Sequence, residues 1–255
     1  MPSRALLGLY AFIVATSIWF MVDTGTAGEL STENKTVESV GAFMFFVGSA
    51  FFFACLVRSS SAGLRQMRNL YYLGLGLVFF MAFGEEMSWG QHIFGWGSPS
   101  AFEGNVQGET NLHNLQAFHW RPGASPKGDS NGVLILSLGS LVTIFILGFT
   151  FALPLAYRAL SPFHRFVDKF EIPVHPLRIG ALAFVAFVLS RVGLAIHPNT
   201  GWPMRELMEM QFAVVVAAIA YAGFARLKEE DHVEQQARPH RAVPASGVPS
   251  SKLEF

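Results

Sequence analysis

Glu85, Ser88 and His92 bring a carboxylate, a hydroxyl and an imidazole to the end of a strongly apolar run. If the run Asn69–His92 is one helix, these residues stand at positions i, i+3 and i+7 and share a face. Such a set could act as a general acid and base, or two of its members could ligate a metal ion. Alternatively, the same side chains could only hydrogen-bond to neighbouring helices and hold them together.

Glu86 points about 100° away from that face and adds a second carboxylate at a similar depth. Arg191 lies well inside another apolar segment, Leu177–Ile196, and its depth there matches the two glutamates within about one helical turn. Because an unpaired charge is costly away from water, the matched depth predicts an ion pair between Arg191 and Glu85 or Glu86. The remaining carboxylate would then be available for chemistry. Arg191 could also anchor a carboxylate or an anionic headgroup.

A second polar cluster lies in the connection after this segment, where Glu109 and His113 stand at i and i+4. If Thr110–Phe118 is a short helix, both side chains share a face, at a spacing that can hold a divalent metal. Together with His92 they are the candidate metal ligands. An Asn- and Gln-rich capping helix without a metal is the alternative interpretation. The residues that we expect to contact a substrate are Trp89, Gln91, Asn111 and Asn114.

The composition indicates which elements must position these residues. The chain has 255 residues, of which 51% are hydrophobic and 14% are charged, whereas soluble domains carry about 25% charged residues. The formal net charge is zero, so we expect no nucleic-acid partner. The one cysteine, Cys55, cannot form a disulfide within the chain. The sequence contains no serine-hydrolase elbow, phosphate-binding loop or CxxC pair.

Six apolar segments are long enough to cross a bilayer as helices, which takes about 20 residues each. The sequence therefore predicts an all-α polytopic membrane protein, a bundle of about six transmembrane helices. The first segment is too long for a signal-peptide core and lacks a clean cleavage site, so we interpret it as an anchor. The expected segments are Ala5–Val22, Val40–Val57, Asn69–His92, Gly132–Tyr157, Leu177–Ile196 and Leu207–Phe224.

Charges in the connections orient the bundle in the membrane. The positive-inside rule places both termini in the cytoplasm and the long connection 93–131 outside, where its aromatic residues favour a cap. We expect a transmembrane domain over residues 1–228 and a disordered cytoplasmic tail over 229–255, which is charged and then rich in Pro, Ala and Ser. The basic residues behind this orientation are Arg58, Arg65, Arg68, Arg158, Arg165, Lys169, Arg178, Arg226 and Lys228.

Two short motifs resemble those of an uncharacterised family of multi-pass bacterial membrane proteins. The first, Glu-Glu-x-Ser-Trp-Gly-Gln, runs from Glu85 to Gln91, and the second, Asn-Leu-His-Asn, runs from Asn111 to Asn114. The resemblance implies a multi-pass protein of the bacterial inner membrane but no mechanism, because the family has no settled biochemistry. The alkaline ceramidases also place Glu, Ser and His on membrane helices, but their paired-histidine motif is missing here. The matching positions are Glu85, Glu86, Ser88, Trp89, Gln91, His92, Asn111, His113 and Asn114.

These features support three functional hypotheses. The leading one is a membrane-embedded enzyme, with or without a divalent metal, acting on a lipid or lipid-linked substrate that enters from the bilayer. Glu85 or Glu86 would be the acid, base or ligand, and His92 and His113 would be ligands or proton carriers. The second hypothesis is a small proton-coupled transporter in which a Glu–Arg191 pair opens and closes. The third is a scaffold or accessory membrane subunit whose aromatic loop docks a partner.

Overall fold

The computed structural model describes residues 3–31, 36–61, 66–105, 108–112, 115, 138–198 and 201–237. Within those ranges the chain is helical, apart from loops and one isolated bridge between Asn105 and Leu115. Six of the described helices are long and apolar enough to cross a membrane. The all-α polytopic bundle predicted from the sequence is therefore confirmed, and the protein is a multi-pass membrane protein.

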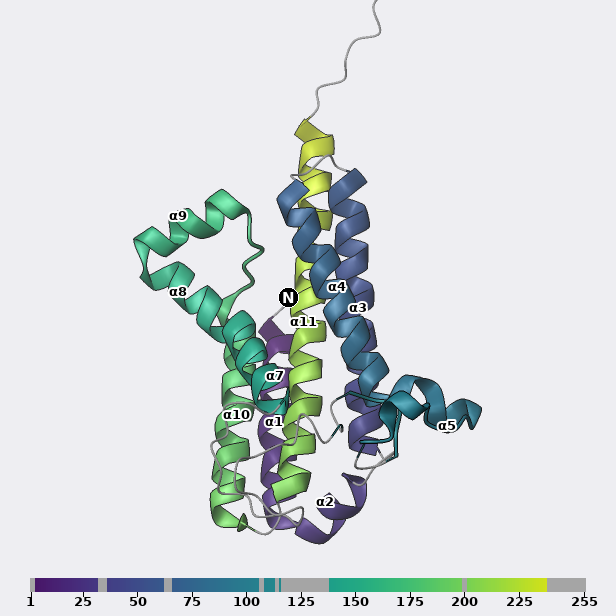
Figure 1. Ribbon diagram of the computed structural model, residues 1–255. Coiled ribbons are helices and arrows are strands. Elements are labelled where there is room, and N and C mark those ends of the chain that lie inside the picture. The colour runs from purple at the N-terminus through teal and green to yellow at the C-terminus, as the bar shows by residue number, and fades with distance from the viewer. Residues whose placement is uncertain are drawn as a thin grey trace, which may run out of the picture.

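The crossings run in alternating directions along the bundle (Figure 1). Helix α7, the π-helical turn η3 and helix α8 together make the fourth crossing, Gly139–Ala159. The elements are α1 (Ser3–Val22), α2 (Thr24–Leu30), α3 (Thr36–Ser61), α4 (Gln66–Glu86), η1 (Ser88–Gly90), α5 (Gln91–Phe94), η2 (Ser100–Phe102), α7 (Leu138–Leu147), η3 (Gly148–Ala152), α8 (Leu153–Ala159), α9 (Ser161–Phe170), α10 (Leu177–Ile196) and α11 (Gly201–Ala237).

Helix α11 forms the centre of the bundle, and its crossing, Pro203–Glu230, is the most buried of the six. Helix α3 approaches it closely at Gly48, where an added Cβ would lie 3.2 Å from a methyl carbon of Val216. Small residues at such crossings let membrane helices pack in close van der Waals contact. Helix α4 packs on α3 in turn, with the rings of Phe45 and Phe79 stacked at 5.9 Å. This packing sets the depth at which α4 ends.

Helix α4 ends at Glu86 and not at His92 as predicted. The following residues, Ser88–Gly90, have positive φ angles of 42°, 53° and 84°. Left-handed residues cannot continue a right-handed helix, and for residues other than glycine they bring Cβ too close to the backbone. The prediction that Glu85 shares one helical face with Ser88 and His92 was therefore wrong.

Helix α11 continues to Ala237, so the residues directly after position 228 are helical and not disordered as predicted. Arg226 Nε donates a hydrogen bond to Glu230 Oε1 at 2.9 Å, an i,i+4 pair of the kind that supports exposed helices. Residues 238–255 lie outside the described ranges, and the predicted disorder there stays a prediction.

The π-helical turn η3 is fixed by residues that come later in the chain. The Thr150 carbonyl oxygen in this turn accepts a hydrogen bond from His175 Nε2 at 2.8 Å. Burial lowers the pKa of His175, so the ring is neutral near pH 7 and donates from this one nitrogen. The same carbonyl lies against Gly180 of α10, where an added Cβ would overlap it. The turn therefore depends on close contact between the fourth and fifth crossings.

Candidate functional site

A left-handed turn, Ser88–Gly90, redirects the chain at the end of α4 and folds the Trp89 indole back onto that helix. The ring lies so close to Gly84 that a Cβ there would be 2.7 Å from it, and Trp89 Nε1 donates to Glu85 Oε1 at 3.0 Å. Left-handed residues other than glycine cost about 1–3 kcal/mol each and occur often at functional sites. Further interactions must therefore hold this turn in place.

The carboxylate of Glu109 provides those interactions, although it belongs to the following loop. Its Oε2 accepts hydrogen bonds from Ser88 Oγ at 2.8 Å and from Asn111 Nδ2 at 2.6 Å. Asn111 Nδ2 also lies 3.0 Å from Ser88 Oγ, to which it donates. All three side chains are buried. Glu109 thus reaches across from the loop and fastens the turn at the end of α4.

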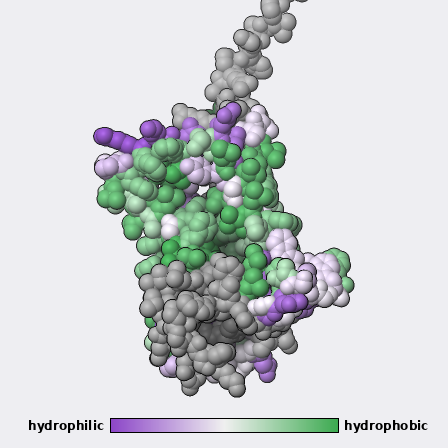
Figure 2. Space-filling model, in the orientation of Figure 1, coloured by the Kyte–Doolittle hydropathy of each residue, from purple (hydrophilic) through white to green (hydrophobic). Residues whose placement is uncertain are grey.

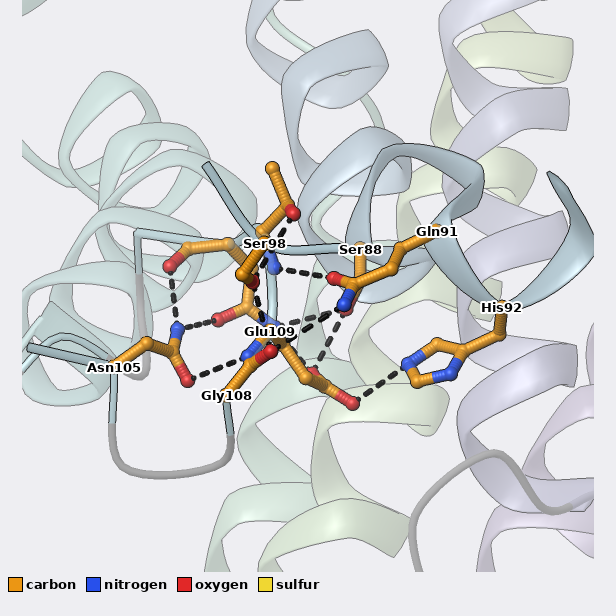
Figure 3. Close-up of polar contacts among 9 residues, drawn as sticks. Ser88, Gln91, His92, Ser98, Asn105, Gly108 and Glu109 are labelled. Atoms are coloured by element: carbon orange, nitrogen blue, oxygen red, sulfur yellow. Dashed lines mark hydrogen bonds and ion pairs between the residues drawn. The ribbon is translucent and has the colours of Figure 1, made fainter. Parts of the chain in front are cut away.

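His92, on the short helix α5, contacts the other oxygen of the same carboxylate. Its Nε2 lies 2.8 Å from Glu109 Oε1 (Figure 3). Where the carboxylate is ionised and the ring is neutral, Nε2 is the donor in this contact and Nδ1 keeps the lone pair. The His92 side chain is 40% exposed, whereas that of Glu109 is 8% exposed. A buried carboxylate therefore fixes one edge of the imidazole while the ring remains accessible.

Side chains around the turn also hold the backbone of the loop beside Glu109. Leu112 N donates to Glu85 Oε2 at 2.6 Å, and Thr110 N donates to Gln91 Oε1 at 2.7 Å. Gln91 Nε2 donates in return to a loop carbonyl oxygen at 3.3 Å. Because these bonds tie the loop down on both sides of Glu109, its carboxylate has a defined position.

Two further residues, Asn105 and Ser98, complete the site. Asn105 accepts a hydrogen bond from Glu109 N at 3.1 Å, and its Nδ2 donates to the carbonyl oxygen and Oδ1 of Asn111, both at 2.9 Å. Ser98 Oγ donates to the Gly108 carbonyl oxygen at 2.7 Å. Asn105 opens the polar segment of the sequence that contains Glu109 and Asn111, but no role was predicted for it. No sequence signal marked Ser98.

Most of the predicted site residues lie together, but a turn and a loop position them and not the two helices that we predicted. The described residues of the expected helix Thr110–Phe118, positions 110–112 and 115, are not helical. His113 and Asn114 lie outside the described residues, so their roles stay predictions. The predicted residues that the structure brings together are Glu85, Ser88, Trp89, Gln91, His92, Glu109 and Asn111.

The described residues include only two of the three predicted metal ligands, His92 and Glu109, because His113 lies outside the described ranges. Among the described residues, no group of three or more His, Cys, Asp or Glu side chains is placed to hold a metal ion. His92 and Glu109 are neighbours, but both Glu109 oxygens already accept hydrogen bonds. Zinc sites in proteins use three or four protein ligands, so these two residues alone do not make one.

Arg191 does not form the ion pair that we predicted with Glu85 or Glu86. Its guanidinium carbon lies 5.0 Å from the centre of the Phe187 ring, in a cation–π contact. Within the described part of the chain no carboxylate pairs with it. Equal depth did not bring the two charges together, because depth leaves the position around the bundle undetermined. Glu86 instead lies within electrostatic range of other carboxylates, among them those of Glu209, Glu206, Glu38 and Glu85.

Exposed apolar side chains lie next to His92 in the chain. Ile93 is 65% exposed and Phe94 is 72% exposed, and the Phe94 ring stacks on Trp96 with a centroid separation of 5.2 Å. In Figure 1, α5 projects sideways from the bundle near the end of α4. Aromatic residues at the end of a crossing commonly anchor a protein in the membrane–water interface. The imidazole therefore lies beside a surface suited to lipid.

No protein-family model, curated protein or solved structure matches this chain. Any functional inference therefore starts from the geometry of the site.

Proposed function

We propose that this protein is a membrane-embedded enzyme whose general base is His92 and whose substrate is a lipid or a lipid-linked molecule. The observation that carries the proposal is the 2.8 Å contact between His92 Nε2 and Glu109 Oε1, in which the carboxylate is buried and the imidazole is exposed. A carboxylate that orients an imidazole and stabilises its protonated form recurs in unrelated acid–base sites.

Glu109 suits this role because other groups fix its position. Ser88 and Asn111 donate to Oε2, which leaves Oε1 for His92. When the ring takes a proton on Nδ1, the adjacent carboxylate stabilises the imidazolium that forms. The Ser88 hydroxyl points to Glu109 and not to the imidazole, so it is a positioning residue here. The group that His92 activates would be a water molecule or a hydroxyl of the substrate.

The surroundings of His92 favour a lipid as the substrate. The residues after it, Ile93 and Phe94, expose large apolar side chains at the end of a membrane crossing. Such side chains enter the boundary between headgroups and acyl chains. A base at that depth is in reach of ester, phosphate or hydroxyl groups near the headgroup. A water-soluble substrate would not require exposed apolar side chains beside the base.

Replacing His92 with alanine should abolish the reaction while the protein still folds, because the exposed ring contributes little to packing. Cellular lipids would be compared by mass spectrometry between cells without the protein and cells with wild type, His92→Ala or Glu109→Gln. The lipid change caused by the wild type should be slowed about 100-fold or more in each variant, the usual contribution of a general base. The double variant should be no slower, because the two residues act as a unit.

His164→Ala is the matched control for this experiment. His164 is also exposed and also lies beside a carboxylate, at 3.4 Å from Asp168, but it is on α9. This control should keep the wild-type lipid change. A lipid change that persists in His92→Ala would contradict the proposal. If Phe94→Ala or Trp96→Ala loses cellular function while His92→Ala keeps it, the scaffold hypothesis would be favoured instead.

We further propose that both termini face the cytoplasm and that the site faces outward from a bacterial inner membrane. The support is the distribution of basic residues in the connections. Cysteine labelling in a Cys55→Ala background tests it, since Cys55 is buried. Ser100→Cys should react with an impermeant maleimide added to intact cells, and Lys228→Cys should react only after the membrane is opened. The reverse pattern would overturn the orientation.

A further inference from the structure

Helix α9 carries a row of aromatic side chains along one face. Phe163, Phe166 and Phe170 stand at i, i+3 and i+7, and neighbouring rings have centroid separations of 6.1 Å and 4.7 Å. Phe166 in the middle of the row is 50% exposed. A helix with an apolar stripe and a charged opposite side is amphipathic and favours a membrane surface.

Basic side chains border this aromatic row. Arg165 and Lys169 are exposed on α9, and Arg158 is exposed in the last turn of α8. Lys169 Nζ lies over the Phe170 ring, 5.6 Å from its centre, so this charge lies against the last ring of the row. The arm formed by α8 and α9 thus presents cations next to aromatic surface.

The acid on α9 does not neutralise these cations. Asp168 accepts a hydrogen bond from Tyr157 OH at 3.1 Å and lies 3.4 Å from His164 Nε2. Within the described part of the chain, none of the three basic side chains forms an ion pair. Their counter-charge is therefore expected from outside the chain.

The connectivity places α9 at a membrane surface, because it joins the end of one crossing, Gly139–Ala159, to the start of the next, Leu177–Ile196. In Figure 1, α8 and α9 extend sideways from the upper part of the bundle, away from α5. Figure 2 shows hydrophilic atoms along the upper edge of this arm and hydrophobic atoms below it. This is the arrangement expected when basic side chains meet headgroups and aromatic rings enter the bilayer.

We propose that α9 and the last turn of α8 form a binding surface for anionic phospholipids. Arg158, Arg165 and Lys169 bind the headgroups, and the row around Phe166 inserts between the acyl chains. Lipid is the occupant that fits, because cations without an ion-pair partner in the described part of the chain lie beside the exposed Phe166 ring, in the connection between two membrane crossings. An anionic headgroup supplies the missing charge, whereas a zwitterionic one supplies no net charge. The surface lies across the membrane from His92 and does not depend on the proposed reaction.

The purified full-length protein, kept in a neutral detergent, would be titrated with phosphatidylglycerol or phosphatidylcholine, and bound lipid would be counted by native mass spectrometry. Each basic residue at an anionic surface contributes about fivefold to affinity. The double variant Arg165→Gln/Lys169→Gln should therefore bind phosphatidylglycerol roughly 25-fold more weakly. Phosphatidylcholine binding should be weaker than phosphatidylglycerol binding in the wild type and should not change in the variant.

Two further variants keep this test decisive. Arg226→Gln/Lys228→Gln removes the same charge from exposed residues of α11 and should bind phosphatidylglycerol like the wild type. Arg165→Lys/Lys169→Arg keeps the charge and should also bind like the wild type, which separates loss of charge from a damaged helix. Unchanged phosphatidylglycerol affinity in Arg165→Gln/Lys169→Gln would overturn the proposal. An equal loss in the α11 variant, or equal binding of both lipids by the wild type, would overturn it as well.

Discussion

Gly180→Ala should destabilise the protein by about 3–5 kcal/mol, more than overpacking usually costs. The added Cβ would overlap the Thr150 carbonyl oxygen, and this atom belongs to the backbone of η3 and cannot rotate away. The two crossings must separate, and the hydrogen bond from His175 to that carbonyl is then lost. Each buried polar group left without a partner adds about 1–3 kcal/mol to the cost.

Thermal unfolding in detergent, followed by tryptophan fluorescence, would measure this effect. For a protein of this size the midpoint should fall by about 10 °C. Gly74→Ala is the matched control, because no atom lies within 4 Å of a Cβ added to that helical glycine. It should keep or slightly raise the midpoint, since alanine favours a helix over glycine by about 0.5–1 kcal/mol. Equal midpoints for the two variants would show that the contact at Gly180 is not rigid.

The membrane architecture could be predicted from the sequence, but the interruptions of its helices could not. An apolar run of about 20 residues is a local property, so all six crossings were found from hydropathy. The end of α4 before Ser88 is different, because a left-handed serine and tryptophan have no local signature and depend on Glu109. The π turn at Thr150 likewise depends on Gly180 and His175, which lie in and before the next crossing.

The candidate site shows the same division between local and distant information. The types of residue were informative, because a carboxylate, a hydroxyl and an imidazole at the end of a membrane helix, here Glu85, Ser88 and His92, mark a candidate functional site. The geometry could not be predicted, because Ser88 and His92 contact the same carboxylate, Glu109, which lies in a loop later in the chain. The pairing of Arg191 with a glutamate failed for a related reason. Hydropathy fixes the depth of a residue along a helix but not the direction in which its side chain points.

Glu109→Ala should release the loop that follows α5, and Glu109→Gln should release it much less. The alanine variant leaves Ser88, Asn111 and His92 without their common acceptor, and removing one partner of a buried network costs about 3 kcal/mol. Hydrogen exchange of the peptide that contains Thr110 and Leu112 measures this, because both amides donate to side chains near the turn. Their exchange should become about 100-fold faster in the alanine variant.

Comparing Glu109→Gln with Glu109→Ala separates the structural role of the carboxylate from its role in the reaction. Glutamine keeps the size of the side chain and one oxygen to accept from Ser88 and Asn111, so the loop should stay in place. It cannot supply the negative charge that stabilises an imidazolium at His92. Glu109→Gln should therefore lose the lipid change while keeping most of its exchange protection, and Glu109→Ala should lose both. Glu103→Ala, an exposed acid in the same loop, should change neither. If Glu109→Gln keeps full activity, the carboxylate only holds the loop in place, and its negative charge is not needed for His92 to act as a base.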